Sequence, residues 1–211
     1  MRLAFSRFGE GNASNVIILH GLLGSKRNWF GVGKALSDFG FNDWKAIENM
    51  LNSESGKIIY SQTHELLKDR EVLVLREKKT VEQRRYLIEK TKPGISSPLQ
   101  MQFSCVPAKD FKINTSSLVA ALDYDKLTFP LELRKWKEGD VFQPLGLKGK
   151  KKLSDFFIDQ KKNIFEKENT WLLCSNDQIV WVVGSRIDER FKLVEKTQKV
   201  YLAELNDVFG K

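Results

Sequence analysis

Histidine and cysteine are scarce in this sequence, which has two of each among its 211 residues. Cys105 and Cys174 lie far apart and form no Cys-x-x-Cys pair, so we expect neither a zinc site nor a disulfide framework, but buried thiols in a reducing compartment. A catalytic triad also lacks its base, because His20 and His64 both precede the middle of the chain. We therefore assign no metal ligand and no catalytic residue.

Long apolar runs are missing as well, since none approaches the roughly 20 residues that span a bilayer. The N-terminus shows no secretory signal pattern, so the protein is expected in the cytoplasm and away from membranes. Acidic residues are in deficit: 35 Lys and Arg outnumber 27 Asp and Glu, which gives a net charge of +8. This balance favours a polyanionic partner.

The residue pattern predicts an α+β fold with a small α/β part at the N-terminus and a β-rich C-terminal part. A strand at residues 15–19 leads into a turn at His20-Gly21 and a helix over residues 28–39. A linker rich in Pro, Gly and Ser is predicted at residues 92–98, and we expect a domain boundary there. The expected parts are residues 1–37, 38–92 and 93–211.

Beyond residue 93 the pattern predicts short strands and one main helix, at residues 152–161. Residues 171–183 predict a hairpin that turns at Asn176-Asp177, and residues 199–205 predict a final strand. Residues 111–113 are a further candidate for extended structure. Together these elements would form one compact β-rich unit.

The densest positive charge lies between residues 134 and 162, where nine Lys or Arg face four Asp or Glu, a net charge of +5. Gly146 and Gly149 allow close approach to the backbone, and Lys150 to Lys152 precede the predicted helix. A phosphate could accept hydrogen bonds from the first-turn amides and take countercharge from these lysines. A solvated basic loop is the alternative.

Two short motifs fail on their spacing. His20-Gly21, continuing LLGSKRNW, resembles the opening of α/β-hydrolase esterases over residues 1–37, yet no G-x-S-x-G elbow and no late histidine follow. A phosphate loop needs four residues between its glycines and then Lys-Ser or Lys-Thr, whereas two intervene at Gly21 and at Gly146. An esterase-derived fragment stays an alternative, and a Walker ATP site is rejected.

Charged and aromatic residues near the end of the chain allow two interpretations each. Asp188 and Glu189, between Arg186 and Arg190, would order a turn through ion pairs, or would orient the two arginines toward RNA phosphates. Tryptophans in apolar strands are usually core residues. Only Trp136, which lies among charges, is a candidate for stacking on a base.

Several blocks in order, FPLELRKWKEGDVFQPLGLKGKKKLSDFFIDQK, IVWVVGSRIDERF and TQKVYLAEL, give the sequence from Phe129 onward a resemblance to the C-terminal domain of bacterial tRNA(Ile)-lysidine synthetase. Upstream, FGFNDWKAIENMLNSESGKIIYSQTHELLKDREVLVL resembles the segment that precedes this domain. The resemblance covers about residues 38–211 and implies a substrate-binding-like middle segment at residues 38–92 and a tRNA-binding C-terminal domain at residues 93–211.

This family adenylates an anticodon cytidine with ATP and magnesium and joins lysine to it. Its catalytic domain carries an SGGxDS loop, which this sequence does not contain. The resemblance therefore implies no cofactor within this chain, leaves the ligase reaction open, and points to a separate catalytic domain or a homodimer, or else to an inert fusion fragment.

As partner the resemblance implies tRNA, gripped at its acceptor stem. The residues implied to contact its backbone are Arg134, Lys135, Lys148, Gly149, Lys150, Lys151, Lys152, Arg186 and Arg190.

Overall fold

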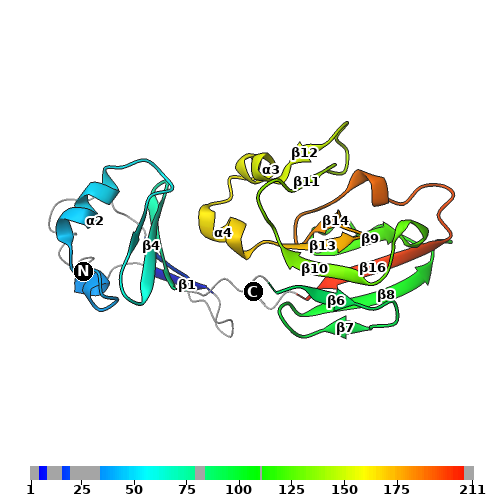
Figure 1. Ribbon diagram of the computed structural model, residues 1–211, viewed down its shortest axis with the longest axis horizontal. Coiled ribbons are helices and arrows are strands. Elements are labelled where there is room, and N and C mark those ends of the chain that lie inside the picture. The colour runs from blue at the N-terminus through cyan, green and yellow to red at the C-terminus, as the bar shows by residue number, and fades with distance from the viewer. Residues whose placement is uncertain (1–4, 9–15, 20–33, 79–83, 110, 207–211) are drawn as a thin grey trace. The chain divides into compact units, whose positions relative to one another are not determined.

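The computed structural model describes residues 5–8, 16–19, 34–78, 84–109 and 111–206 (Figure 1). The chain forms two compact units, Met1–Val81 and Glu82–Lys211. The segment predicted as a linker, residues 92–98, lies inside the second unit, where Gly94 and Ile95 pair with a neighbouring strand. Pro93 and Pro98 flank this short strand, so the missing proline N–H groups do not interrupt its pairing.

Unit 1 contains a five-stranded sheet in the order β1-β2-β5-β4-β3, in which every neighbouring pair is antiparallel. Its described elements are β1 (Phe5–Phe8), β2 (Val16–Leu19), α2 (Trp44–Leu51), β3 (Ile58–Tyr60), β4 (His64–Asp69) and β5 (Val72–Glu77). The strand predicted at residues 15–19 is confirmed as β2. The predicted helix at 28–39 falls partly outside the described residues, and residues 34–37 are helical.

Helix α2 forms where the sequence supplies both a cap and an apolar face. The Asp43 carboxylate accepts a hydrogen bond from the Ala46 N–H at 3.0 Å, which satisfies one of the free amides of the first turn. Ile47 and Met50, three residues apart, are buried in a cluster with sheet residues that include Leu66. The helix therefore covers the apolar side of the unit 1 sheet.

Unit 2 is built mainly from strands. Its elements are β6 (Tyr86–Ile88), β7 (Gly94–Ile95), β8 (Met101–Pro107), β9 (Val119–Asp123), η1 (Tyr124–Lys126), β10 (Leu131–Lys135), β11 (Val141–Phe142), β12 (Lys151–Lys152), α3 (Leu153–Asp159), α4 (Ile164–Asn169), β13 (Trp171–Ser175), β14 (Gln178–Val182), β15 (Arg186–Ile187), η2 (Glu189–Phe191) and β16 (Lys199–Leu205). The predicted α+β, β-rich fold class is confirmed.

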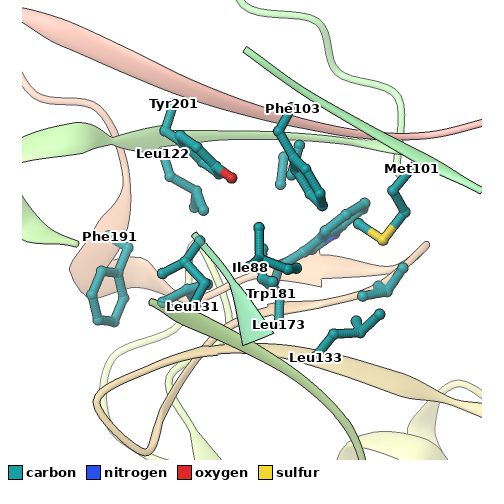
Figure 2. Close-up of a cluster of buried hydrophobic side chains, with 14 residues drawn as sticks. Ile88, Met101, Phe103, Leu122, Leu131, Leu133, Leu173, Trp181, Phe191 and Tyr201 are labelled. Carbon is teal, nitrogen blue, oxygen red and sulfur yellow. The ribbon is translucent and has the colours of Figure 1, made fainter. Parts of the chain in front are cut away.

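Two sheets of unit 2, ordered β15-β14-β13-β10-β6 and β7-β8-β16-β9, enclose a common hydrophobic core. Figure 2 shows Phe103 and Tyr201 from one sheet pointing toward Leu133, Leu173 and Trp181 from the other. Alternate residues of β8, β10 and β16 face this core, as the period of two in a β-strand requires. In β14 the consecutive residues Val180 and Trp181 both do, at an irregularity in its pairing with β13. The core thus fixes the sheet that carries the basic segment.

The other face of β13 and β14 is buried too. Leu172 and Cys174 lie in a second cluster with Phe142 of β11 and with Phe156 and Phe157 of α3. Burial on both faces explains why β13 reads as a continuous apolar run, WLLCS, instead of an alternating one. This packing attaches α3 and the β11–β12 hairpin to the sheet.

Local predictions in unit 2 had mixed outcomes. The hairpin turn at Asn176-Asp177 is confirmed: both residues have positive φ (47° and 60°), as a two-residue type I′ turn requires. The extended structure predicted at residues 111–113 is not a strand. Helix α4 was missed, although Asn163 and Glu166 form the reciprocal capping box that marks a helix start.

Candidate nucleic-acid interface

The basic segment lies on the hairpin formed by β11 and β12, in and beside the connection at residues 143–150. Lys148, Lys150 and Lys152 are exposed. The hairpin brings three lysines within five residues onto one short projection that packs on the sheet through α3. When a phosphate backbone binds to clustered, solvated ammonium groups, the nucleic acid releases the counterions that were condensed on it, and this release favours binding.

A tight turn opens this connection. The Leu147 N–H donates to the Pro144 carbonyl oxygen at 2.9 Å, and Gly146 between them has a φ of 87°. Positive φ at the third turn position, without positive φ at Leu145 before it, indicates a type II turn and favours glycine. Gly149 has a φ of 93°, and an added Cβ at either glycine meets no described atom within 4 Å. The glycines thus set the backbone and leave its surface open.

Residues 186–189 hold the first half of the connection. Backbone bonds run from the Leu145 N–H to the Ile187 carbonyl oxygen (3.0 Å) and from the Glu189 N–H to the Gln143 carbonyl oxygen (2.7 Å). The Glu189 carboxylate accepts the Gly146 N–H at 2.9 Å. The connection is therefore held by contacts between segments more than 40 residues apart in sequence.

Arg186 is exposed and lies beside the same turn, where its guanidinium donates to the Leu145 carbonyl oxygen at 3.3 Å. A guanidinium offers five N–H groups, so one such bond leaves donors for a phosphate. Arg186 and the lysines of the connection therefore belong to one basic surface, which we call the hairpin patch: Lys148, Gly149, Lys150, Lys152 and Arg186.

Arg134 does not belong to the hairpin patch, although the sequence suggested it. Its side chain is 8% exposed, and its two terminal nitrogens donate to the two carboxylate oxygens of Asp140 at 2.9 and 2.8 Å. The carboxylate raises the pKa of Arg134 against the opposing effect of burial. A bidentate pair of this kind anchors the start of the hairpin and leaves Arg134 little surface for an RNA.

Arg190 is likewise engaged within the protein. Two of its nitrogens donate to the fully buried Asp188 carboxylate, at 2.9 and 2.8 Å, and a third donates to Gln178 at 2.8 Å. The hydrogen bond with Asp188 raises the pKa of Arg190. The prediction that Asp188 orders this turn through an ion pair is confirmed.

Two other predicted residues, Lys135 and Lys151, also contact protein groups. The Lys135 ammonium lies over the Trp171 ring, 4.3 Å from its centroid, and the Lys151 ammonium pairs with Asp159. Both side chains keep partial exposure. They can add charge at the edge of the hairpin patch but are not its most accessible cations.

Helix α3 begins directly after the patch, at Leu153, whose N–H donates to the Asp140 carbonyl oxygen at 2.8 Å. It spans seven residues instead of the predicted ten, and Asp155 lies in its first turn. The helix anchors the hairpin through Leu153, Phe156 and Phe157, and its buried face is what the sequence predicted. The exposed lysines, more than the helix terminus, supply the positive charge.

Trp136, the candidate for base stacking, packs edge-on against Phe157 with ring centroids 5.3 Å apart. It borders the second cluster and is half-buried. Trp181 is 1% exposed, which confirms its predicted place in the core. Trp136 thus contributes mainly to packing beneath the hairpin.

Sequence reasoning missed a second group of cations in unit 2. The ammonium groups of Lys90 and Lys199 lie 5.1 and 5.9 Å from the centroid of the Tyr124 ring. A hydrogen bond with Tyr124 raises the pKa of Lys90. The three residues come from widely separated segments, so no local charge run could have indicated them.

Among the described residues, no helix is long and apolar enough to cross a membrane. The same ranges contain no group of three or more His, Cys, Asp or Glu side chains placed to hold a metal ion.

Two family models match the chain: the TilS substrate binding domain over residues 32–78 and the TilS substrate C-terminal domain over residues 131–204. The tRNA(Ile)-lysidine synthase of Parabacteroides distasonis is 50% identical over 153 residues, which are 72% of this chain and 35% of the relative. That of Bacteroides thetaiotaomicron is 34% identical over 177 residues, 82% of this chain and 38% of the relative.

The chain is similar to the C-terminal region of tRNA(Ile)-lysidine synthases. A crystal structure of the TilS C-terminal domain matches with a TM-score of 0.50 at 20% identity and covers 60% of this chain and 100% of that domain, which shows a shared fold. The chain spans between a third and two fifths of the length of the two relatives. The TilS models begin at residue 32, so the hydrolase-like opening gains no support from them.

Proposed function

We propose that this chain binds tRNA through the hairpin patch of unit 2 and serves as the substrate-holding part of a tRNA(Ile)-lysidine synthase. One observation carries the proposal: Lys148, Lys150 and Lys152 are exposed on one anchored hairpin, and the exposed Arg186 of β15 lies beside its turn. All four lie inside the segment that matches the TilS substrate C-terminal domain. The name of the family model and those of the relatives favour tRNA among polyanions.

Within tRNA this surface suits a duplex, and the duplex that we propose is the acceptor stem. A-form RNA has a deep, narrow major groove, so proteins contact its duplexes mostly through phosphates and 2′-hydroxyl groups, without reading sequence. The hairpin patch offers cations and open glycine backbone, which are groups for such contacts. The choice of tRNA(Ile) over other tRNAs would then come from elsewhere in the enzyme.

The modification reaction would require a catalytic domain with the SGGxDS loop, a string that this sequence does not contain. We propose that such a domain, joined to this chain or separate from it, supplies the ATP and magnesium chemistry, and that the chain that holds the tRNA acts as a single copy or as a homodimer. The free thiols Cys105 and Cys174 suit the reducing cytoplasm proposed as the site of action.

The esterase alternative has less support. Folds of the α/β class place helices on both faces of a mostly parallel sheet, whereas β2 pairs antiparallel with β1 and β5. The turn at His20-Gly21, on which the resemblance depended, lies outside the described residues. No observation in the described part of unit 1 favours hydrolysis.

The proposal is tested by titrating tRNA(Ile) with the full chain at several salt concentrations, following fluorescence anisotropy. Lys148, Lys150 and Lys152 changed together to Glu should weaken binding about 100- to 1,000-fold and reduce the slope of log K against log salt by about 2 to 3, because each lost phosphate contact removes 0.7 to 0.9.

A matched control changes the exposed Lys109, Lys112 and Lys196 to Glu, which alters the net charge equally. Equal weakening by both triple variants would show only non-specific attraction. Absence of binding by the unmodified chain at low salt would refute the proposal.

A further inference from the structure

The hairpin patch stands next to two carboxylates that ought, by charge alone, to weaken phosphate binding. Asp188 is fully buried and neutralised by Arg190, but Glu189 keeps a partly exposed side chain. Glu189 lies beside the very turn that leads into Lys148 and Lys150. Its position calls for a physical explanation.

Both carboxylate oxygens of Glu189 have partners, and one of these partners is the turn. Oε2 accepts the Gly146 N–H at 2.9 Å, and Oε1 pairs with the Lys192 ammonium, which keeps the carboxylate in place. The hydrogen bond with Lys192, followed by that with Gly146, lowers the pKa of Glu189. The N–H of the third residue of a type II turn has no partner within the turn, so Glu189 supplies one from a distant segment.

The rest of segment 186–189 holds the turn from other sides. The Gln143 N–H donates to Asp188 at 2.8 Å, and Arg186 donates to the Leu145 carbonyl oxygen. These bonds all fall on Gln143, Leu145 and Gly146, the part of the connection that leads directly into Lys148 and Lys150. The exposed lysines therefore extend from a turn that is ordered before any ligand arrives.

Resting on the proposed function, we propose that Glu189 is a positioning residue for tRNA binding, which acts by ordering the Gly146 turn and with it the hairpin patch. A surface loop ordered only on binding adds its entropy cost to the binding free energy, whereas a loop ordered during folding does not. One surface carboxylate repels phosphates weakly, because water and salt screen it over about 10 Å. The affinity gained from the ordered turn therefore exceeds the affinity lost to repulsion between Glu189 and the phosphates.

The experiment compares two substitutions of equal charge change, Glu189→Ala and Glu195→Ala, in the full chain, with tRNA(Ile) as the probe. Glu195 is exposed and lies six residues further along the chain. Charge alone predicts that both variants bind slightly tighter. Our proposal predicts that Glu189→Ala binds about five- to tenfold weaker, the loss of one charge-assisted hydrogen bond, while Glu195→Ala binds as tightly as the unmodified chain or tighter.

A conservative variant and a structural readout complete the design. Glu189→Gln retains an acceptor for the Gly146 N–H and should recover part of the affinity. Hydrogen exchange at the Gly146 amide should be faster in Glu189→Ala and unchanged in Glu195→Ala, with the same melting temperature for the unit 2 core. This readout separates local ordering from loss of fold.

The outcomes distinguish the two proposals. If the unmodified chain binds tRNA(Ile) and needs Lys148, Lys150 and Lys152, but Glu189→Ala binds as tightly as Glu195→Ala, the positioning role is refuted and the proposed function stands. If the unmodified chain does not bind, the proposed function fails first.

Discussion

Asp140→Asn would remove the negative charge that holds Arg134 while keeping the shape of the side chain. Arg134 and Asp140 are 8% and 6% exposed, and two N–H groups of the guanidinium donate to the carboxylate at 2.9 and 2.8 Å. The carboxylate also accepts the Lys137 N–H at 2.8 Å. The substitution leaves a buried guanidinium without its counterion.

The expected loss is about 3 to 5 kcal/mol in the free energy of unfolding of unit 2, the usual cost of removing one partner from a buried ion pair. For a unit of this size such a loss lowers the melting temperature by roughly 10 to 20 °C. Asp159→Asn is the matched control, because its pair with Lys151 is largely exposed and worth about 1 kcal/mol or less.

The chain has two compact units, so a single melting curve can mix two transitions. Hydrogen exchange at core amides of β10 and β13 follows unit 2 alone. A loss below about 1 kcal/mol for Asp140→Asn, or equal losses for the two Asn variants, would refute the reasoning that the pair is a buried anchor.

Because Asp140 holds its guanidinium, Arg134 is not expected to contact RNA. Arg134→Met, assayed well below its melting temperature, should leave the salt slope of tRNA binding unchanged, because a residue bound to Asp140 makes no phosphate contact. A slope reduced by about 0.7 to 0.9 would return Arg134 to the binding surface.

Two titratable groups give further predictions. The pKa of Glu189 is lowered by Lys192 and Gly146, so its bond to the Gly146 N–H is present above the ordinary value of 4.5 and is lost as the pH falls through the lower folded value. The Gly146 amide shift, followed by NMR, should titrate with a midpoint below 4.5, and a midpoint at or above that value would contradict the contact. Burial raises the pKa of Cys174 to about 12, whereas Cys105 is exposed, so the expectation of buried thiols is confirmed for Cys174 and wrong for Cys105. A thiol reagent at neutral pH should therefore modify one cysteine in the folded chain and the second only after unfolding; two equally fast reactions would show that Cys174 is accessible.

Local sequence patterns were sufficient for elements whose conformation is decided within a few residues. The turn at Asn176-Asp177 needs two residues that tolerate positive φ between β-forming runs, and the sequence shows both. The final strand at residues 199–205 was predicted to its ends. The strand predicted at 111–113 was wrong, since an apolar pair without a partner strand does not make a sheet.

Domain limits and side-chain roles depended on distant contacts. The proline-containing segment at residues 92–98 reads as a linker, yet β7 finds its partner in β8 and lies within unit 2. Arg190 and Arg186 are four residues apart and look alike in sequence. The buried Asp188 carboxylate and Gln178 accept hydrogen bonds from the Arg190 guanidinium, whereas Arg186 is exposed to solvent.

The sequence was sufficient for the basic balance of the chain, the β-rich class of its C-terminal part, the position of the lysine-rich segment and the resemblance to lysidine synthetases. These properties follow from composition, local periodicity and the order of motifs. Tertiary structure alone decided which cations face solvent, because exposure depends on partners that folding supplies: Asp140 covers Arg134, and Glu189 reaches Gly146 from 43 residues away. The sequence sets which charged residues the chain carries, and packing decides which of them a ligand can reach.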